Sequence, residues 1–305
     1  MHASAMRQQA SAGALSFPLR MRVRFRWVVL FLAVAIVLPF LAAQLRRPSN
    51  ERDWTPSQRV LPRVVVRGDL VEIRNVREYV YRTESDYDAR YATRVYDLRK
   101  LDSVWYAVSR FGAVPGMAHA FLTFGFGDDY VAISVEARRE HGESYGPIRG
   151  MLREYELLYV IGAESDVIGL RTNIWKESVS LYPIRTSRDK MRAAFLGMTG
   201  RAESLAVRPE FYNTLTNSCI SNIVRHVNEV SPDRIPFRLR TVLPGFSDRL
   251  AYEEKLIDTD LPFDAIEKAF RIDTAAQRHG LGPGYSKAIR AELPKSRRSS
   301  PLVRR

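Results

Sequence analysis

Alternating apolar and polar positions predict strands in the first half of the chain, and apolar positions at helical spacing predict helices in the second half. We expect strands at 70–73, 79–82, 93–98, 157–161 and 179–184. Residues 101–110 fit a strand or a short helix equally well. Long helices are predicted at 187–205 and 216–230, and shorter ones at 148–154, 165–171, 263–270 and 285–293. The expected class is α+β with a mostly antiparallel sheet.

A β-hairpin is the clearest local prediction. Strands at 118–124 and 130–136 flank a turn that contains Gly127 and two aspartates. If Gly127 and Asp128 form the turn, His119 lies opposite Glu136 on the same sheet face. If the turn is moved on by one residue, His119 lies opposite Arg138 instead.

An apolar run at 27–43 contains no charged residue and follows four arginines at alternate positions from 20 to 26. This pattern predicts a transmembrane anchor over 27–45, with a long cleaved signal peptide as the alternative. Because the arginines precede the run, we expect a cytoplasmic basic segment at 1–26 and an exported body. The remaining divisions are a linker at 46–68, a domain at 69–293 and a disordered basic tail at 294–305.

The net charge of +13 is concentrated at the two ends of the chain. Residues 1–52 carry +7 and residues 295–305 carry +5, so the body between them carries +1. A nearly neutral body lacks the attraction for phosphates that drives most DNA binding, so we expect no nucleic-acid partner. The single cysteine excludes an intramolecular disulfide and a cysteine-based zinc cluster. We predict no metal and no cofactor, and the sequence leaves the oligomeric state open.

That cysteine, Cys219, is the candidate nucleophile. It follows three residue types that favour helix N-caps, so it falls in the first turn of the helix at 216–230. A helix N-terminus favours the nucleophilic thiolate and offers free N–H groups to an oxyanion. The alternative is an inert, buried cysteine. The candidate base is His119, because it lies in an apolar strand where a polar side chain needs a partner. Glu136 is the candidate to orient it.

Three stretches of the chain resemble a known family in the same order. They are HAFLTFGFGDDYVAISVEARREHGESY, REYELLYVIGAESDVIGLRTN and RPEFYNTLTNSCISNIVRHV. Together they resemble the Lnb N-terminal periplasmic domain family over roughly 69–292. The resemblance implies a permuted papain-like (NlpC-type) fold, in which the histidine strand precedes the cysteine helix. It also implies a catalytic pair at Cys219 and His119 and a periplasmic domain on the bacterial inner membrane.

The namesakes of this family are bacterial lipoprotein N-acyltransferases, which move an acyl chain from a phospholipid to a lipoprotein amine. The expected function is therefore a membrane-tethered thiol acyltransferase or acyl hydrolase with phospholipid or acylated substrates and lipoprotein partners. The alternatives are a cysteine peptidase or amidase and a non-catalytic envelope binding module. Candidate substrate-binding residues, taken from their positions in these stretches, are Asn217, Tyr145, Tyr159, Arg171 and Asn173.

Overall fold

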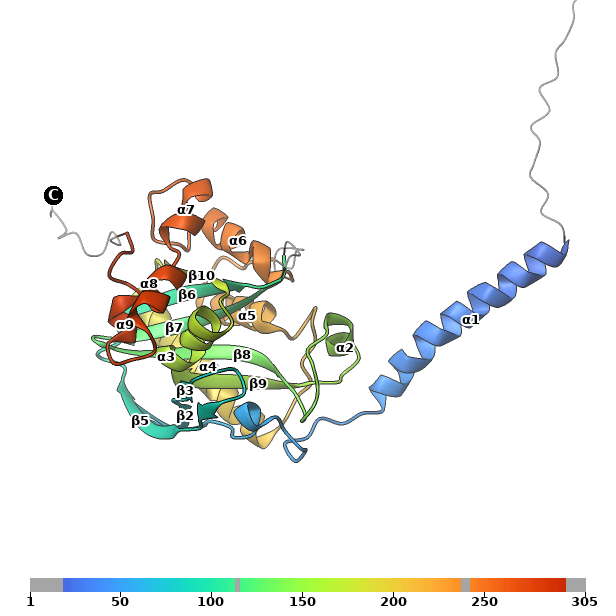
Figure 1. Cartoon of the computed structure of the whole chain (residues 1–305), viewed down its shortest axis with the longest axis horizontal. Coiled ribbons are helices and arrows are strands. Elements are labelled where there is room, and N and C mark those ends of the chain that lie inside the picture. Colours follow the sequence, from blue (N-terminus) through green and yellow to red (C-terminus); the bar gives the residue numbers. More distant parts are fainter. Residues whose placement is uncertain (1–18, 113–115, 237–241, 295–305) are drawn as a thin grey trace, which may run out of the picture. The chain divides into compact units, whose positions relative to one another are not determined.

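The structure is a computed structural model that describes residues 19–112, 116–236 and 242–294. The chain divides between Arg46 and Arg47 into two compact units. The first contains α1 (Leu19–Gln44), a helix with Pro39 in its interior. The second is the α+β body (Figure 1).

Across the described ranges, no helix is long and apolar enough to cross a membrane. The prediction of a transmembrane anchor at 27–45 is therefore not supported. The charge-free run covers 17 residues, which extend about 26 Å along a helix, whereas the hydrocarbon core of a bilayer is about 30 Å thick. The rest of α1 includes the arginines at alternate positions from 20 to 26.

An eight-stranded mixed sheet forms the centre of the body, in the order β1-β2-β9-β8-β7-β6-β10, and β5 also pairs with β2 (Figure 1). The only parallel pair among the described strands is β2 with β9. A separate two-stranded ribbon joins β3 (Val80–Tyr81) to β4 (Tyr87–Asp88). The strands of the sheet are β1 (Arg63–Arg67), β2 (Leu70–Arg77), β5 (Tyr91–Asp97), β6 (Ser103–Arg110), β7 (Ala118–Phe126), β8 (Asp129–Arg138), β9 (Glu156–Ala163) and β10 (Ser178–Pro183). The ambiguous stretch at 101–110 is thus mostly strand.

The hairpin of β7 and β8 adopts the register that brings His119 toward Glu136. Gly127 occupies the turn with a φ of 73°, which glycine adopts without strain. Phe126 lies opposite Asp129, and the ladder runs regularly to Phe121 opposite Ser134. There it ends, although β6 follows β7 as far as Ala118 and β9 follows β8 as far as Arg138. The starting end of β7 therefore separates from β8.

Helices cover both faces of the sheet. On one face lie α4 (Arg188–Val207) and α5 (Cys219–Val230), and their apolar side chains share a core with Leu122, Phe124 and Ile133. On the other face lie α3 (Glu164–Gly169), α8 (Asp273–His279) and α9 (Tyr285–Ala288), which pack on Phe121 and Leu158. Side chains alternate between the two faces along each strand, so one strand serves two cores. The shorter helices are α2 (Pro147–Met151), α6 (Ser247–Glu253), α7 (Phe263–Ala269), η1 (Pro56–Gln58) and η4 (Pro244–Phe246).

The segment predicted as a linker, 46–68, is instead part of the body. Trp54 is buried, and the guanidinium of Arg138 lies over its ring at 4.0 Å. Residues 63–67 form β1, an outer strand of the sheet. The prolines and arginines of residues 46–68 led to the wrong prediction, because such residues are common both in tethers and at sheet edges. Residues 295–305 of the predicted basic tail lie outside the described residues. Residues 1–18 of the predicted cytoplasmic segment also lie outside them.

Candidate active site

Cys219 is the first residue of α5 and carries a buried free thiol. Ser218 is the N-cap, and its N–H donates to Ser221 Oγ at 2.7 Å. The loop before it is held by reciprocal backbone hydrogen bonds between Asn213 and Asn217. This arrangement fixes the thiol at the positive end of the helix, where first-turn N–H groups have no partner within the helix.

His119 meets a hydroxyl and a carboxylate through the same ring nitrogen. Its Nε2 lies 2.6 Å from Ser134 Oγ and 3.2 Å from Glu136 Oε1. The Ser134 hydroxyl lies 2.6 Å from the same carboxylate oxygen. Sequence reasoning missed Ser134, although one signal was present. It precedes Glu136 by two residues on a strand, so both side chains lie on one face.

Arg171 binds the same oxygen of this carboxylate. It lies in η2 (Leu170–Ile174), a π-helical turn that continues from α3. Its Nη2 donates to Glu136 Oε1 at 2.9 Å, and its Nη1 donates to the carbonyl of Val167 at 2.7 Å. The guanidinium is buried and lies over the ring of Phe121 at 5.0 Å. The predicted pocket residue Arg171 thus lines the site chiefly by binding Glu136.

These contacts determine the charges at neutral pH. Burial disfavours the charged imidazolium, but the Glu136 carboxylate more than compensates, and the pKa of His119 is raised to about 9. The neighbouring Cys219 also raises the pKa of His119, whereas Arg171 lowers it. Burial also opposes ionisation of Glu136, yet His119 and Arg171 hold its pKa well below the usual range. Cys219 therefore lies beside an imidazolium that is paired with a carboxylate.

The imidazole and the thiol approach each other from opposite faces of the sheet. His119 stacks on Phe121, in the core covered by α3 and α8. Cys219 belongs to the core covered by α4 and α5. The two can interact because β7 and β8 separate beyond Phe121 and Ser134. The cavity at this opening is lined by β8 residues of both faces, including Val135 and Glu136.

This cavity has a volume of about 480 Å³, within the range of small-molecule sites. Tyr145 lies at its wall, with its hydroxyl 3.3 Å from that of Tyr212. Burial and the neighbouring Cys219 raise the pKa of Tyr212, so its hydroxyl stays protonated. Trp175 and Glu177 complete another wall. Sequence reasoning identified Tyr145 but not Tyr212, Trp175 or Glu177, which carry no local motif.

Three predicted substrate-binding residues lie outside this cavity, because their polar groups serve the fold. The Asn217 amide donates to the carbonyl of Phe211 and accepts from Asn222 within the loop before α5. Tyr159 is buried, and its hydroxyl lies 3.0 Å from Nε2 of His226. Asn173 donates to the carbonyl of Ala276 in α8. Position within a matching stretch did not separate structural residues from pocket residues.

Comparison with known proteins identifies one family. No curated protein and no solved structure matches the chain. The model of one family, described as the Lnb N-terminal periplasmic domain, matches residues 87–245, just over half of the chain. The match spans the His119 strand, Glu136, Arg171 and the start of the Cys219 helix. The chain therefore belongs to the Lnb N-terminal periplasmic domain family.

Proposed function

We propose that Cys219 and His119 form a nucleophile and base pair that transfers an acyl group through a thioester. The observation that carries this proposal is the placement of the only cysteine at the start of α5, in the lining of the same cavity as an imidazole that Glu136 and Ser134 orient. A nucleophile, a base and an orienting carboxylate are the parts that covalent thiol catalysis requires.

The first half of the reaction forms the acyl-enzyme. The Cys219 thiolate attacks the acyl carbonyl carbon, and first-turn N–H groups of α5 stabilise the resulting oxyanion. His119 donates its proton to the leaving alcohol or amine as the bond to carbon breaks. Because Nε2 faces Ser134 and Glu136, we assign this proton transfer to Nδ1, the other ring nitrogen.

The second half returns the enzyme to its starting state. An acceptor amine or water loses a proton to His119 and attacks the thioester carbon, and the carbon–sulfur bond breaks to release the thiolate. The product is an amide if the acceptor is an amine and a carboxylic acid if it is water. By the resemblance described above, we propose that the acyl donor is a phospholipid and the acceptor a lipoprotein amine.

Two findings support the proposed compartment and the proposed fold of this domain. The matching family is described as periplasmic, and we propose that this domain works in that compartment. The strand that carries His119 precedes the helix that carries Cys219, which is the order expected of a permuted papain-like enzyme. We infer that the body is such a domain.

Intact-mass measurement tests the proposal. The full chain is incubated with vesicles of one phospholipid, and we expect a mass increase equal to one acyl group, lost on treatment with hydroxylamine. The variants Cys219→Ala and His119→Gln should show no increase, whereas His141→Gln, an exposed loop histidine, should behave like the wild type. An acyl adduct that persists in Cys219→Ala would overturn the proposal.

The same measurement of Cys219 modification distinguishes the two alternative functions. If peptide or cell-wall amides, and not lipid esters, modify Cys219, the domain is a peptidase or amidase. If no substrate modifies it, and iodoacetamide alkylates the folded protein no faster than a model thiol between pH 6 and 8, the domain is a binding module.

A further inference from the structure

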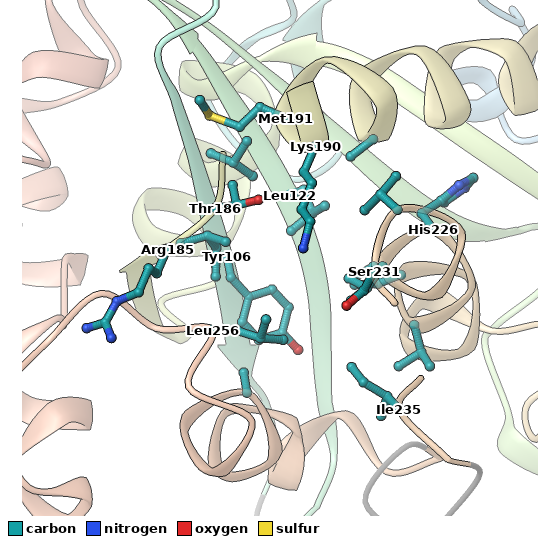
Figure 2. Close-up of a pocket in the computed structure, with 18 of the residues that line it drawn as sticks. Tyr106, Leu122, Arg185, Thr186, Lys190, Met191, His226, Ser231, Ile235 and Leu256 are labelled. Carbon is teal, nitrogen blue, oxygen red and sulfur yellow. The ribbon is translucent and has the colours of Figure 1, made fainter. Parts of the chain in front are cut away.

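A second cavity, of about 200 Å³, is lined in part by α5 (Figure 2). Ile220, the residue after Cys219, lines this cavity, whereas Cys219 lines the first one. Tyr106 also lines the second cavity, and its hydroxyl donates to Ser247 Oγ. The two cavities are therefore separate and share the first turn of α5 as a wall.

Aliphatic side chains make up most of the lining. They come from β6, β7, α4, α5 and α6, so the cavity lies between the sheet and the helices of one face. The principal members are Val104, Leu122, Met191, Ile223, Val227 and Leu250. Such a surface favours an apolar ligand, since removing apolar surface from water is favourable.

Lys190 is the cation that this cavity offers to a ligand. Its side chain runs from the start of α4 and points toward Tyr106 and Ser231 (Figure 2). In the part of the chain that the structure describes, no carboxylate pairs with its amine. Arg185 and His226 also line the cavity, but they are engaged elsewhere, by Asp258 and Tyr159 respectively.

We propose that this cavity binds a single aliphatic chain that ends in an anionic head group, with the head group at Lys190. The aliphatic lining accommodates the chain, and the unpaired amine supplies the complementary charge. A volume below the roughly 300–1,000 Å³ of typical ligand pockets suits a slender chain better than a ring system. The head group can be a carboxylate or a phosphate, because both satisfy one ammonium group.

This inference does not rest on the proposed function. The binding site contains neither Cys219 nor His119, so a Cys219→Ala variant is expected to bind the chain as the wild type does. Loss of acyl transfer and loss of chain binding are therefore separate results.

Isothermal titration calorimetry on the full chain in detergent-free buffer tests the proposal. The probes are dodecanoate, dodecyl phosphate and dodecan-1-ol, each below its aggregation concentration. We expect one anionic ligand per chain, bound about fivefold to tenfold more tightly than the alcohol. The tighter of the two anions identifies the head group, and failure of both to bind would overturn the proposal.

Two matched pairs of variants locate the site. Ala194 lines the cavity and Ala193 is exposed on the same helix, so Ala194→Phe should weaken all three probes at least tenfold and Ala193→Phe none of them. Lys190→Met should reduce the affinity of the anions to that of the alcohol, whereas Lys268→Met, on exposed α7, should change nothing. Equal effects within either pair would contradict the assignment, once circular dichroism shows that the variants are folded.

Discussion

His119 and Arg171 approach the same oxygen of Glu136, at 3.2 Å and 2.9 Å. One carboxylate oxygen thus serves two cationic groups, and a hydroxyl from Ser134 lies 2.6 Å from it as well. The charge of the imidazole, the ionisation of Glu136 and the placement of the guanidinium are consequently coupled. Three of the predictions below follow from this sharing.

Replacing Glu136 by glutamine should lower the pKa of His119 from about 9 to below its ordinary value of 6.5. The substitution removes the charge that raises the pKa, while burial and Arg171, which both lower it, remain. The measurement is a pH titration of the histidine ring signals by NMR. The exposed His141 serves as an internal reference, and an unchanged His119 titration would show that Glu136 does not control the imidazole.

The pKa of His119 also predicts how stability depends on pH. Because the folded pKa is raised above 6.5, the stabilisation is complete below pH 6.5 and is lost as the pH rises through about 9. The loss amounts to roughly 3 kcal/mol, since one pKa unit corresponds to about 1.36 kcal/mol. Denaturant unfolding at pH 6 and pH 10 should show this difference in the wild type and His141→Gln but not in His119→Gln. A difference of equal size in His119→Gln would assign the pH dependence to other groups.

Substitution of Arg171 by methionine should destabilise the body by about 3 kcal/mol, because it leaves the partly buried Glu136 with one cationic partner. It should also raise the pKa of Glu136, since Arg171 is one of the groups that lower it. The comparison variant is Arg278→Met, which breaks an ion pair whose two side chains are more than half exposed. We expect no measurable change in its unfolding midpoint, and similar losses in both variants would contradict the assigned role of Arg171.

Gly245 should not tolerate a side chain, because it packs directly on Gly116 beside the Cys219 cavity. A Cβ at Gly245 would lie 2.5 Å from the Cα of Gly116. The clashing atoms of Gly116 belong to the backbone, so no side-chain rotation can relieve the contact. We expect Gly245→Ala to cost about 1–3 kcal/mol and to alter the alkylation rate of Cys219. Gly200, in α4, faces open space, so Gly200→Ala should instead stabilise the protein by about 0.5–1 kcal/mol. We expect the midpoint of thermal unfolding to fall in Gly245→Ala and to rise in Gly200→Ala.

Local chemistry allowed much of the fold and the centre of the site to be predicted. The turn at Gly127 and the alternation in its two strands determine the hairpin register, and that register brings His119 toward Glu136. The cap before Cys219 and the apolar stripe after it determine where α5 lies. Each of these features depends on residues within about ten positions of the turn or of the cap.

The remaining features depend on contacts between distant parts of the chain. Arg171 reaches Glu136 because a π-helical turn directs it there, and no spacing rule in the sequence signals that turn. Tyr212 enters the cavity from the loop before α5, and Lys190 enters the second cavity from α4. Tyr159 and Asn173 were predicted to bind substrate because of their positions in the stretches that resemble the family. Their hydrogen bonds are instead formed with His226 and Ala276.

The separation of β7 from β8 has a consequence for when the thiol becomes reactive. The imidazole is organised by one hydrophobic layer and the cysteine by the other, so neither layer alone contains both groups. An unfolded or half-assembled chain therefore carries an ordinary cysteine with no base beside it. In the proposed reaction, the thiol can therefore act as a nucleophile only after both layers have closed on the sheet.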